Sequence, residues 1–209
     1  MKISKIQILA NLSFFIPLAH LGYQSLTGGL SANPIQTATL ATGRASVYAI
    51  LISLYCSPIA NTLKLSMFHR IRKISGLYAF YYAFAHFLIF AVLDYQLNFS
   101  WILPELQQKT FLQIGLIALL ALLPLAVTSI GFLKHKMGAS WRKLHKMVYV
   151  ITALILLHVA LASKGDIIDP AILTIFYVVA MLFRLPKFKA LQIKSLPIWL
   201  RRLNTFLIS

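Results

Sequence analysis

Histidine is the residue type in this chain with the widest range of chemistry, because a neutral imidazole can bind a metal, carry a proton or form hydrogen bonds. The sequence contains six histidines, and three of them, His20, His86 and His158, lie inside long apolar segments. A polar ring inside such a segment is costly and usually functional. His69 and His135 lie among lysines and arginines instead, so we expect them to be solvated.

The predicted helices 75–96 and 145–163 place two of these histidines at the same depth. With a rise of about 1.5 Å per residue, His86 lies roughly 16 Å and His158 roughly 18 Å from the same edge of the apolar region. Two imidazoles at one level on facing helices can supply both axial ligands of a haem. Hydrogen bonds between neutral imidazoles explain the same pattern, so both interpretations stay open. His20 has a similar depth but no evident partner, and we expect it to be a packing residue.

A third candidate ligand, His145, precedes His158 by 13 residues. On one helix this spacing separates the two rings by about 20 Å along the axis. Two histidines so placed could serve two cofactor levels, one near each face of a membrane. His145 also lies beside Trp141 and Arg142, and an interfacial histidine that reaches the lipid headgroups is the alternative interpretation.

Composition predicts a membrane protein of one domain. The chain has 209 residues, of which 59% are hydrophobic and only 11% are charged, whereas soluble proteins carry roughly 25% charged residues. The net charge of +16 comes from basic residues in short clusters between apolar runs, a pattern that argues against nucleic-acid binding. The single cysteine, Cys56, can form no disulfide within the chain. No internal repeat is visible.

Five apolar segments have the length of a transmembrane helix, for which about 20 residues are needed, and a sixth, 170–185, is short. We therefore predict an all-α bundle with helices at about 6–26, 44–61, 75–96, 110–133, 145–163 and 170–185. The intervening segments are predicted loops: two of them are strongly basic, 64–73 and 134–146, and a third, 97–109, contains Trp101, Pro104 and Glu105.

The distribution of charge predicts the orientation. With six spans, all but three of the 20 Lys and Arg residues fall on the side of both termini. Arg44, Lys109 and Lys164 fall on the other side, together with all four acidic residues. Because positive loops stay in the cytoplasm, both termini are predicted to be cytoplasmic. Residues 1–185 then form the membrane domain, and 186–209 form a basic amphipathic tail on the lipid surface.

Several motifs occur together and in a characteristic order. They are Gly28-Gly29-Leu30-Ser31-Ala32-Asn33-Pro34, Thr42-Gly43-Arg44, Arg72-Lys73-Ile74-Ser75-Gly76-Leu77 before His86, and Trp141-Arg142-Lys143-Leu144-His145-Lys146-Met147-Val148-Tyr149 before His158. This set resembles the haem-binding membrane subunits of bacterial periplasmic methionine-sulfoxide reductase systems, within the wider ferric-reductase-like transmembrane group. The resemblance covers nearly the whole chain, and the Trp-Arg-x-Leu-His segment is its most specific part.

The resemblance implies that residues 1–185 are a transmembrane domain that binds haem b through His86, His145 and His158. It also implies that electrons come from the quinone pool or a cytosolic flavin reductase. They would pass to a periplasmic molybdopterin enzyme that repairs methionine sulfoxide in oxidised proteins. FMN is associated with the family as well, so one haem with a second haem or an FMN is the expected cofactor content.

The chain departs from the wider ferric-reductase pattern, in which two helices carry two histidines each. The residues 13 and 14 positions before His86 are Lys73 and Arg72, so His145 has no histidine opposite. A second haem would need another ligand, or this inner site holds flavin or quinone. Arg72 and Arg142 could neutralise propionates or a phosphate there, and Arg44 could do so on the outer side.

The chain contains no glycine-rich dinucleotide fingerprint, so the electron donor must be a separate molecule. A proton-coupled transporter or channel lined by His20, His86 and His158 is the alternative function. The scarcity of acidic residues inside the predicted spans counts against it. A membrane anchor without a redox role would leave the matched depth of the two histidines unexplained.

Overall fold

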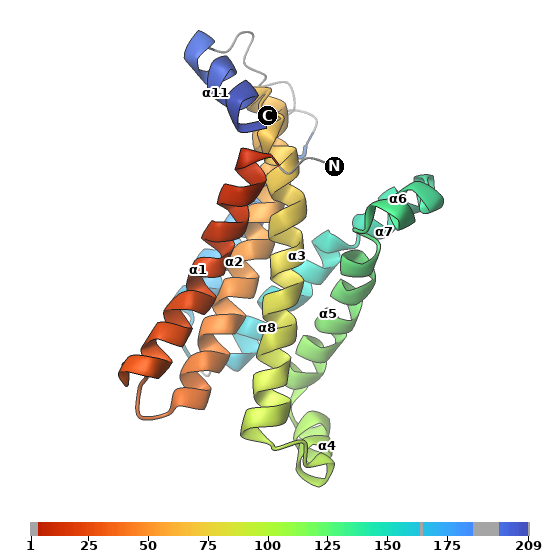
Figure 1. Cartoon of the computed structure of the whole chain (residues 1–209). Coiled ribbons are helices and arrows are strands. Elements are labelled where there is room, and N and C mark those ends of the chain that lie inside the picture. Colours follow the sequence, from red (N-terminus) through yellow and green to blue (C-terminus); the bar gives the residue numbers. More distant parts are fainter. Residues whose placement is uncertain (1–3, 164, 186–196, 209) are drawn as a thin grey trace.

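The structure, a computed structural model, describes residues 4–163, 165–185 and 197–208. Helices make up the architecture, and the described residues contain no strand (Figure 1). In chain order the helices are α1 Lys5–Thr27, α2 Pro34–Leu63, α3 Met67–Leu88, the π-helix η1 Ile89–Asp94, α4 Phe99–Gln108, α5 Thr110–Val127, α6 Gly131–Met137, α7 Ala139–His145, α8 Val148–Ala162, α9 Ile168–Leu182 and α11 Ile198–Ile208.

Five helical segments are long and apolar enough to cross a membrane: Lys5–Thr27, Pro34–Leu63, Met67–Asp94, Thr110–Val127 and Ala139–Ala162. The sixth predicted span corresponds to α9, which has 15 residues. At about 1.5 Å per residue α9 is about 22 Å long, which is less than the roughly 30 Å of a bilayer's hydrocarbon core. The predicted all-α membrane bundle is confirmed, with its last helix shorter than a full span.

The predicted start of the second span was wrong by ten residues, because α2 begins at Pro34 and not at Arg44. Asn33 caps this helix: its side chain accepts a hydrogen bond from the Gln36 backbone N–H at 3.0 Å. Pro34 occupies the first position, where its missing N–H costs nothing. The threonines that lower the hydropathy of this stretch bond their own helix, as Thr39 does to the Ile35 carbonyl at 2.8 Å.

The predicted loops also contain helix. α3 begins at Met67, so most of the basic segment 64–73 lies on its first two turns. The segment 97–109 forms α4, and 134–146 lies on α6 and α7. α5 ends at Val127, six residues before the predicted end of its span. Lys164 and residues 186–196 of the predicted tail lie outside the described residues.

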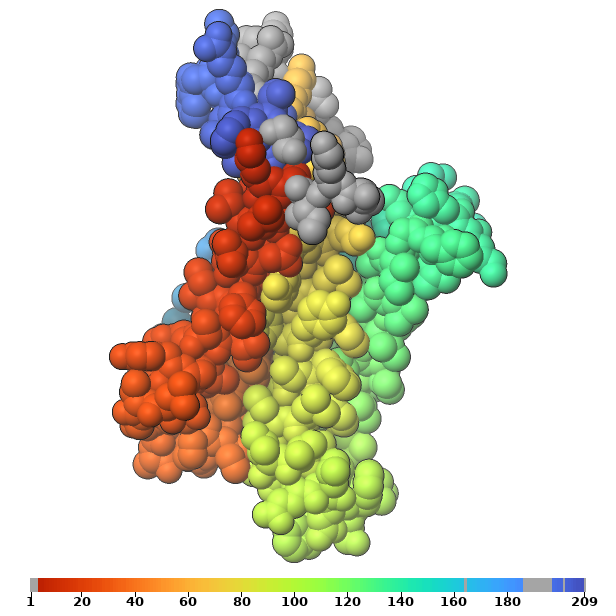
Figure 2. Space-filling view, viewed as in Figure 1, coloured from red at the N-terminus to blue at the C-terminus, as the bar shows by residue number. Residues whose placement is uncertain are grey.

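The bundle is organised around two helix pairs. α2 packs along α3 and α5 packs along α8, while α1 lies outside the first pair and α9 lies against α2 and α8. The core joins Ile50 of α2, Ala79 of α3, Leu122 of α5 and Ile151 of α8. Small residues bring α2 and α3 close together, since the hydroxyl of Ser46 donates to the Ala79 carbonyl at 2.8 Å. Figure 2 shows α1 and α3 on one face, with the α6 segment standing away from them.

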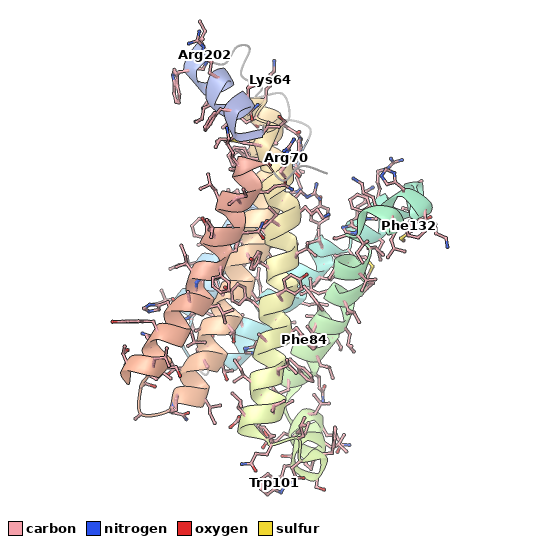
Figure 3. The ribbon with its side chains drawn as sticks, in the orientation of Figure 1. Lys64, Arg70, Phe84, Trp101, Phe132 and Arg202 are labelled. Atoms are coloured by element: carbon pink, nitrogen blue, oxygen red, sulfur yellow. The ribbon has the colours of Figure 1, made fainter. Side chains whose placement is uncertain are left out.

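Charge divides the two ends of the bundle, as Figure 3 shows with Lys64, Arg70 and Arg202 at one end and Trp101 at the other. We call the first the basic end; it also carries Arg72, Lys134, Arg142 and Arg184. The opposite end, which we call the acidic end, carries all four acidic residues: Asp94, Glu105, Asp166 and Asp169.

The described part of the tail, α11, is docked onto the basic end. The side chain of Asn204 accepts a hydrogen bond from the Met67 backbone N–H at 3.2 Å, which caps the start of α3. Arg70 donates to the Ile208 carbonyl at 2.8 Å. The Lys5 ammonium lies 3.5 Å from the centre of the Phe206 ring. The tail therefore joins the first turns of α1 and α3.

Arg184 connects three helices at the basic end. It follows α9, and its guanidinium donates to the Tyr149 hydroxyl of α8 at 3.3 Å. It also donates to the carbonyls of Leu54 in α2 and Ala180 in α9. Among the described residues no carboxylate forms an ion pair with Arg184. Its main contribution is therefore to hold the short helix α9 against α2 and α8.

Replacing Arg184 with methionine should loosen α9 and lower the thermal stability of the protein. Hydrogen bonds from a charged donor contribute about 1.5–3 kcal/mol each, and 1 kcal/mol corresponds to about 2–4 °C at this chain length. We expect the melting temperature in detergent to fall by about 5 °C or more. The matched control is Arg202→Met, which removes an exposed arginine at the same end. Equal melting of both variants would contradict this role.

Candidate functional site

Two histidines from different helix pairs face each other inside the bundle. The ring centroids of His86 in α3 and His158 in α8 are 6.2 Å apart, and the ring planes are nearly perpendicular, at 86°. Both side chains are half-buried. The proximity of these two histidines, which the sequence predicted from their matched depth, is confirmed.

Each of the two rings is held by a backbone carbonyl. The Nδ1 atom of His86 lies 2.8 Å from the Thr39 carbonyl oxygen of α2, and that of His158 lies 2.7 Å from the Phe111 carbonyl oxygen of α5. A carbonyl oxygen can only accept, so Nδ1 must carry the hydrogen in both rings. In the neutral form the proton-free nitrogen is then Nε2, whose lone pair is available to a metal.

A glycine four residues further along the helix lets each ring approach its carbonyl. A Cβ atom at Gly115 would lie 2.8 Å from both Nδ1 and Cε1 of His158, and one at Gly43 would lie 3.1 Å from Nδ1 of His86. Residues i and i+4 lie one above the other on a helix face. A side chain at the second position would therefore cover the carbonyl of the first.

The same arrangement occurs twice, although the sequence shows no repeat. In each helix pair, the residue whose carbonyl accepts the hydrogen bond is followed four positions later by a glycine. The histidine that donates this bond comes 47 residues after the accepting residue. The first set is Thr39, Gly43 and His86 on α2 and α3, and the second is Phe111, Gly115 and His158 on α5 and α8. The site is thus built from two equivalent halves that meet at the imidazoles.

His86 and His158 together could hold a haem. An imidazole–metal bond is about 2 Å long and the ring centre lies about 1 Å beyond the nitrogen, so a metal between two Nε2 atoms separates the ring centroids by about 6 Å. The observed 6.2 Å matches this separation. The described residues contain no cluster of three or more His, Cys, Asp or Glu side chains. Two protein ligands suit a metal that brings its other ligands with it, as haem iron does.

His145 belongs to a different cluster, at the basic end. Its Nε2 atom lies 3.0 Å from the Thr128 hydroxyl, and its ring stacks on Trp141 with centroids 4.0 Å apart. The indole N–H of Trp141 donates to the Thr128 carbonyl at 2.9 Å. The structure does not bring His145 to His86 or His158, and its Nε2 atom could bind a metal only after leaving Thr128.

The three arginines named as candidate cofactor contacts lie in three settings. Arg142 lines a cavity of about 440 Å³ between α6 and α7, together with Lys134, His135, Gly138, Ala139 and Trp141. Arg72 donates to the Ser57 hydroxyl of α2 at 2.8 Å. Arg44 follows Gly43 directly, but its guanidinium is paired with Asp169 of α9 at 3.1 Å.

The remaining histidines lie away from the His86–His158 pair. His20 is exposed on α1, His69 lies on the first turn of α3, and His135 lines the cavity with Arg142. Sequence reasoning missed Thr39, Phe111, Gly115 and Thr128. A glycine inside an apolar helix, as at Gly115, was the available signal, because it costs about 1 kcal/mol relative to alanine and therefore suggests a packing requirement.

Comparison with known proteins identifies the family of the chain. The family model described as the ferric reductase like transmembrane component matches residues 42–163, which include both histidines and both glycines. A Brucella ovis protein, the "Protein-methionine-sulfoxide reductase heme-binding subunit MsrQ", is 34% identical over 173 residues, which are 83% of this chain and 78% of that protein. Proteins of the same name from Brucella canis and Brucella melitensis are 34% and 33% identical over the same shares.

The family model covers more than half of the chain, and these relatives are matched over more than two thirds of their length. The chain therefore belongs to the ferric reductase like transmembrane family and, within it, to the MsrQ family.

Proposed function

We propose that this protein is the haem b-binding electron-transfer subunit of a protein-methionine-sulfoxide reductase system in the bacterial inner membrane. The observation that carries the proposal is the pair His86 and His158, whose Nδ1 atoms are both bound to carbonyls while their ring centres are 6.2 Å apart. The names of the MsrQ relatives support the same function.

The residues of the chain orient the ligands and exclude water. Thr39 and Phe111 accept the Nδ1 hydrogens, and this bond fixes the tautomer and makes Nε2 a better ligand. Gly43 and Gly115 admit the rings to these carbonyls. The haem, when bound, supplies a one-electron redox change at its iron. Since no substrate chemistry is needed on this chain, reduction of methionine sulfoxide belongs to a partner, the periplasmic molybdopterin enzyme.

The basic end faces the cytoplasm and the acidic end faces the periplasm in this proposal. Its support is the concentration of Lys and Arg around both termini and the preference of positive loops for the cytoplasm. Electrons enter at the basic end, from quinol in the membrane or from a cytosolic flavin reductase, and leave at the acidic end.

The cluster at the basic end is the proposed second cofactor site. Trp141, Arg142 and Lys134 line the cavity of about 440 Å³, and the His145 ring stacks on Trp141. These cations suit a haem propionate or the phosphate of FMN. A stacked indole and imidazole also provide an aromatic surface for a planar cofactor.

A proton path through His20, His86 and His158 fits the geometry less well. His20 is exposed on α1, away from the paired rings. Both Nδ1 hydrogens are held by carbonyls, which cannot pass a proton on.

Replacing Gly115 with alanine should strongly reduce haem binding. The added Cβ would come within 2.8 Å of the His158 ring and displace it from the Phe111 carbonyl. Loss of such a supporting contact weakens metal binding by about 10- to 100-fold. The measurement is the haem-to-protein ratio and the Soret spectrum of the purified protein. Gly22→Ala, which adds a Cβ in open space on α1, should bind haem as the native protein does. Full haem content with an unchanged Soret band in Gly115→Ala, or in His158→Ala, would refute the ligand assignment.

Replacing His145 with alanine should remove one redox centre and leave the other intact. Redox titration, with haem and flavin stoichiometry, should find two centres in the native protein and only the His86–His158 haem in His145→Ala. The reason is that His145 lies in a separate cluster with Thr128 and Trp141. A native protein that holds one haem and no flavin would exclude the second site.

Reporter fusions should establish the orientation. Alkaline phosphatase needs disulfides and is active only in the oxidising periplasm, so it should be inactive when fused after Ser209 and active when inserted at Ser31. A green fluorescent protein fused after Ser209 should be bright. The reverse pattern would show that the basic end faces the periplasm.

A further inference from the structure

The helix α4 at the acidic end is firmly attached to the bundle. Its start is capped by the Asn98 side chain, which accepts from the Ser100 N–H at 3.1 Å. Near its end, the side chain of Gln113 in α5 donates to the carbonyls of Leu106 at 2.9 Å and Gln107 at 3.1 Å. Glu105 and Lys109 form an ion pair across its last turn. α4 is therefore a fixed part of the surface and not a loose connection.

One face of α4 is apolar, and part of this face packs against the bundle. Phe99, Ile102, Leu103 and Leu106 follow the spacing of a single helix face. Ile102 and Leu106 are partly buried, whereas Phe99 and Leu103 are 66% and 53% exposed. Exposed apolar side chains at the end of a membrane bundle suit the bilayer interface.

Trp101 lies on the other side of α4. From the helical period it falls roughly opposite Phe99 and Leu103, next to Gln108. Its side chain is 60% exposed, and Figure 3 places it at the extreme acidic end, far from Lys64 and Arg202. A tryptophan that anchors a helix in the interface would share the apolar face. Trp101 thus lies on the side of α4 away from its apolar face, and a large exposed ring in such a place is typical of a protein-binding surface.

The charges at the acidic end indicate what kind of surface a partner would present to it. The described basic residues at the acidic end, Arg44 and Lys109, are each paired with an acidic residue. Asp94 and Asp166 form no ion pair within the described ranges. A partner that covers this end would match it with an apolar pocket for the indole and a basic rim.

This end is also the one closest to the paired histidines. His158 lies four residues before the end of α8, which is about 6 Å along the helix axis. His86 lies 19 residues after the start of α3 at the basic end, which is about 28 Å. Moreover, α4 leads through Lys109 into the first turn of α5, where the Phe111 carbonyl holds His158. A protein bound on α4 would therefore lie over the half-site of His158.

We propose that the water-facing side of α4, with Trp101 at its centre, is the docking site for the soluble, basic-rimmed reductase that accepts the electrons. This inference rests on the proposed function, because it assumes that electrons leave at the acidic end. It adds to that function a specific surface, a specific anchor residue and the chemistry of the partner's binding face.

The test measures binding of the purified sulfoxide reductase subunit from the same bacterium to the haem-loaded protein in lipid nanodiscs. Trp101→Ala should raise the dissociation constant about tenfold or more, as loss of an interface anchor does. The matched control is Phe99→Ala on the membrane-facing side, which should change it by less than about threefold. Both variants should keep the native haem content and Soret spectrum, because neither residue touches the histidine pair. Binding should also weaken as salt increases, because the matching charges are screened.

A second measurement reports the direction of Trp101 without the partner. In a protein with Trp141→Phe and Trp199→Phe, the fluorescence of Trp101 should be quenched by aqueous iodide and not by brominated lipids, and the partner should shield it from iodide. Quenching by brominated lipids instead would show a membrane anchor and overturn the docking site. Native affinity in Trp101→Ala would overturn it too, while leaving the proposed function intact. A native protein that binds haem but is never oxidised by the partner would overturn both proposals.

Discussion

The hydrogen bond between an imidazole Nδ1 and a helical carbonyl is the interaction on which the arrangement of this bundle depends. The carbonyl belongs to a helix and accepts the imidazole as an additional donor. The neighbouring helix must therefore bring the Nδ1 atom within 2.7–2.8 Å of the carbonyl oxygen. A Cβ atom four positions later would lie 2.8 Å from the His158 ring at Gly115 and 3.1 Å from the His86 ring at Gly43, so a side chain at either position would press on the ring. Gly43 and Gly115 each weaken their helix by about 1 kcal/mol relative to alanine. The hydrogen bonds between Nδ1 and the carbonyls, which form because α2 packs closely on α3 and α5 on α8, offset this loss of helix stability.

The membrane strengthens this constraint. In a low-dielectric interior a satisfied hydrogen bond is stronger, and an unsatisfied polar atom is more costly. Once the carbonyls hold both Nδ1 hydrogens, each neutral ring keeps an Nε2 lone pair that these two hydrogen bonds leave unused. Since the two rings belong to different helix pairs, a metal held by both Nε2 atoms, as in the proposed function, would also link α3 to α8.

The sequence predicted the helical class and the approach of His86 to His158, because both follow from counting: apolar run lengths and residues per helix turn. It did not predict the partners of these rings. Every residue has a carbonyl, so neither Thr39 nor Phe111 carries a signal of its own. Thr39 also lies outside the predicted second span, although its hydroxyl bonds the Ile35 carbonyl within α2. The helices α4, α6 and α7 were missed because charge and proline suggested loops where caps and short-range bonds form helix. The repeated spacing of carbonyl, glycine and histidine becomes visible only when the contacts are known.

The histidine pair lies closer to the acidic end of the molecule than to the basic end. His158 lies within two turns of the acidic end of α8, whereas His86 is separated from the basic end by most of α3. On the proposed orientation, an electron could leave from this site over a short distance but would have to enter over a long one. The cluster of His145, Trp141 and Arg142 lies at the basic end, from which the distance to the histidine pair is the longer one. A second redox centre there would divide the long distance into two shorter ones. The asymmetric depth of the first site is therefore itself an argument that the basic end holds a cofactor.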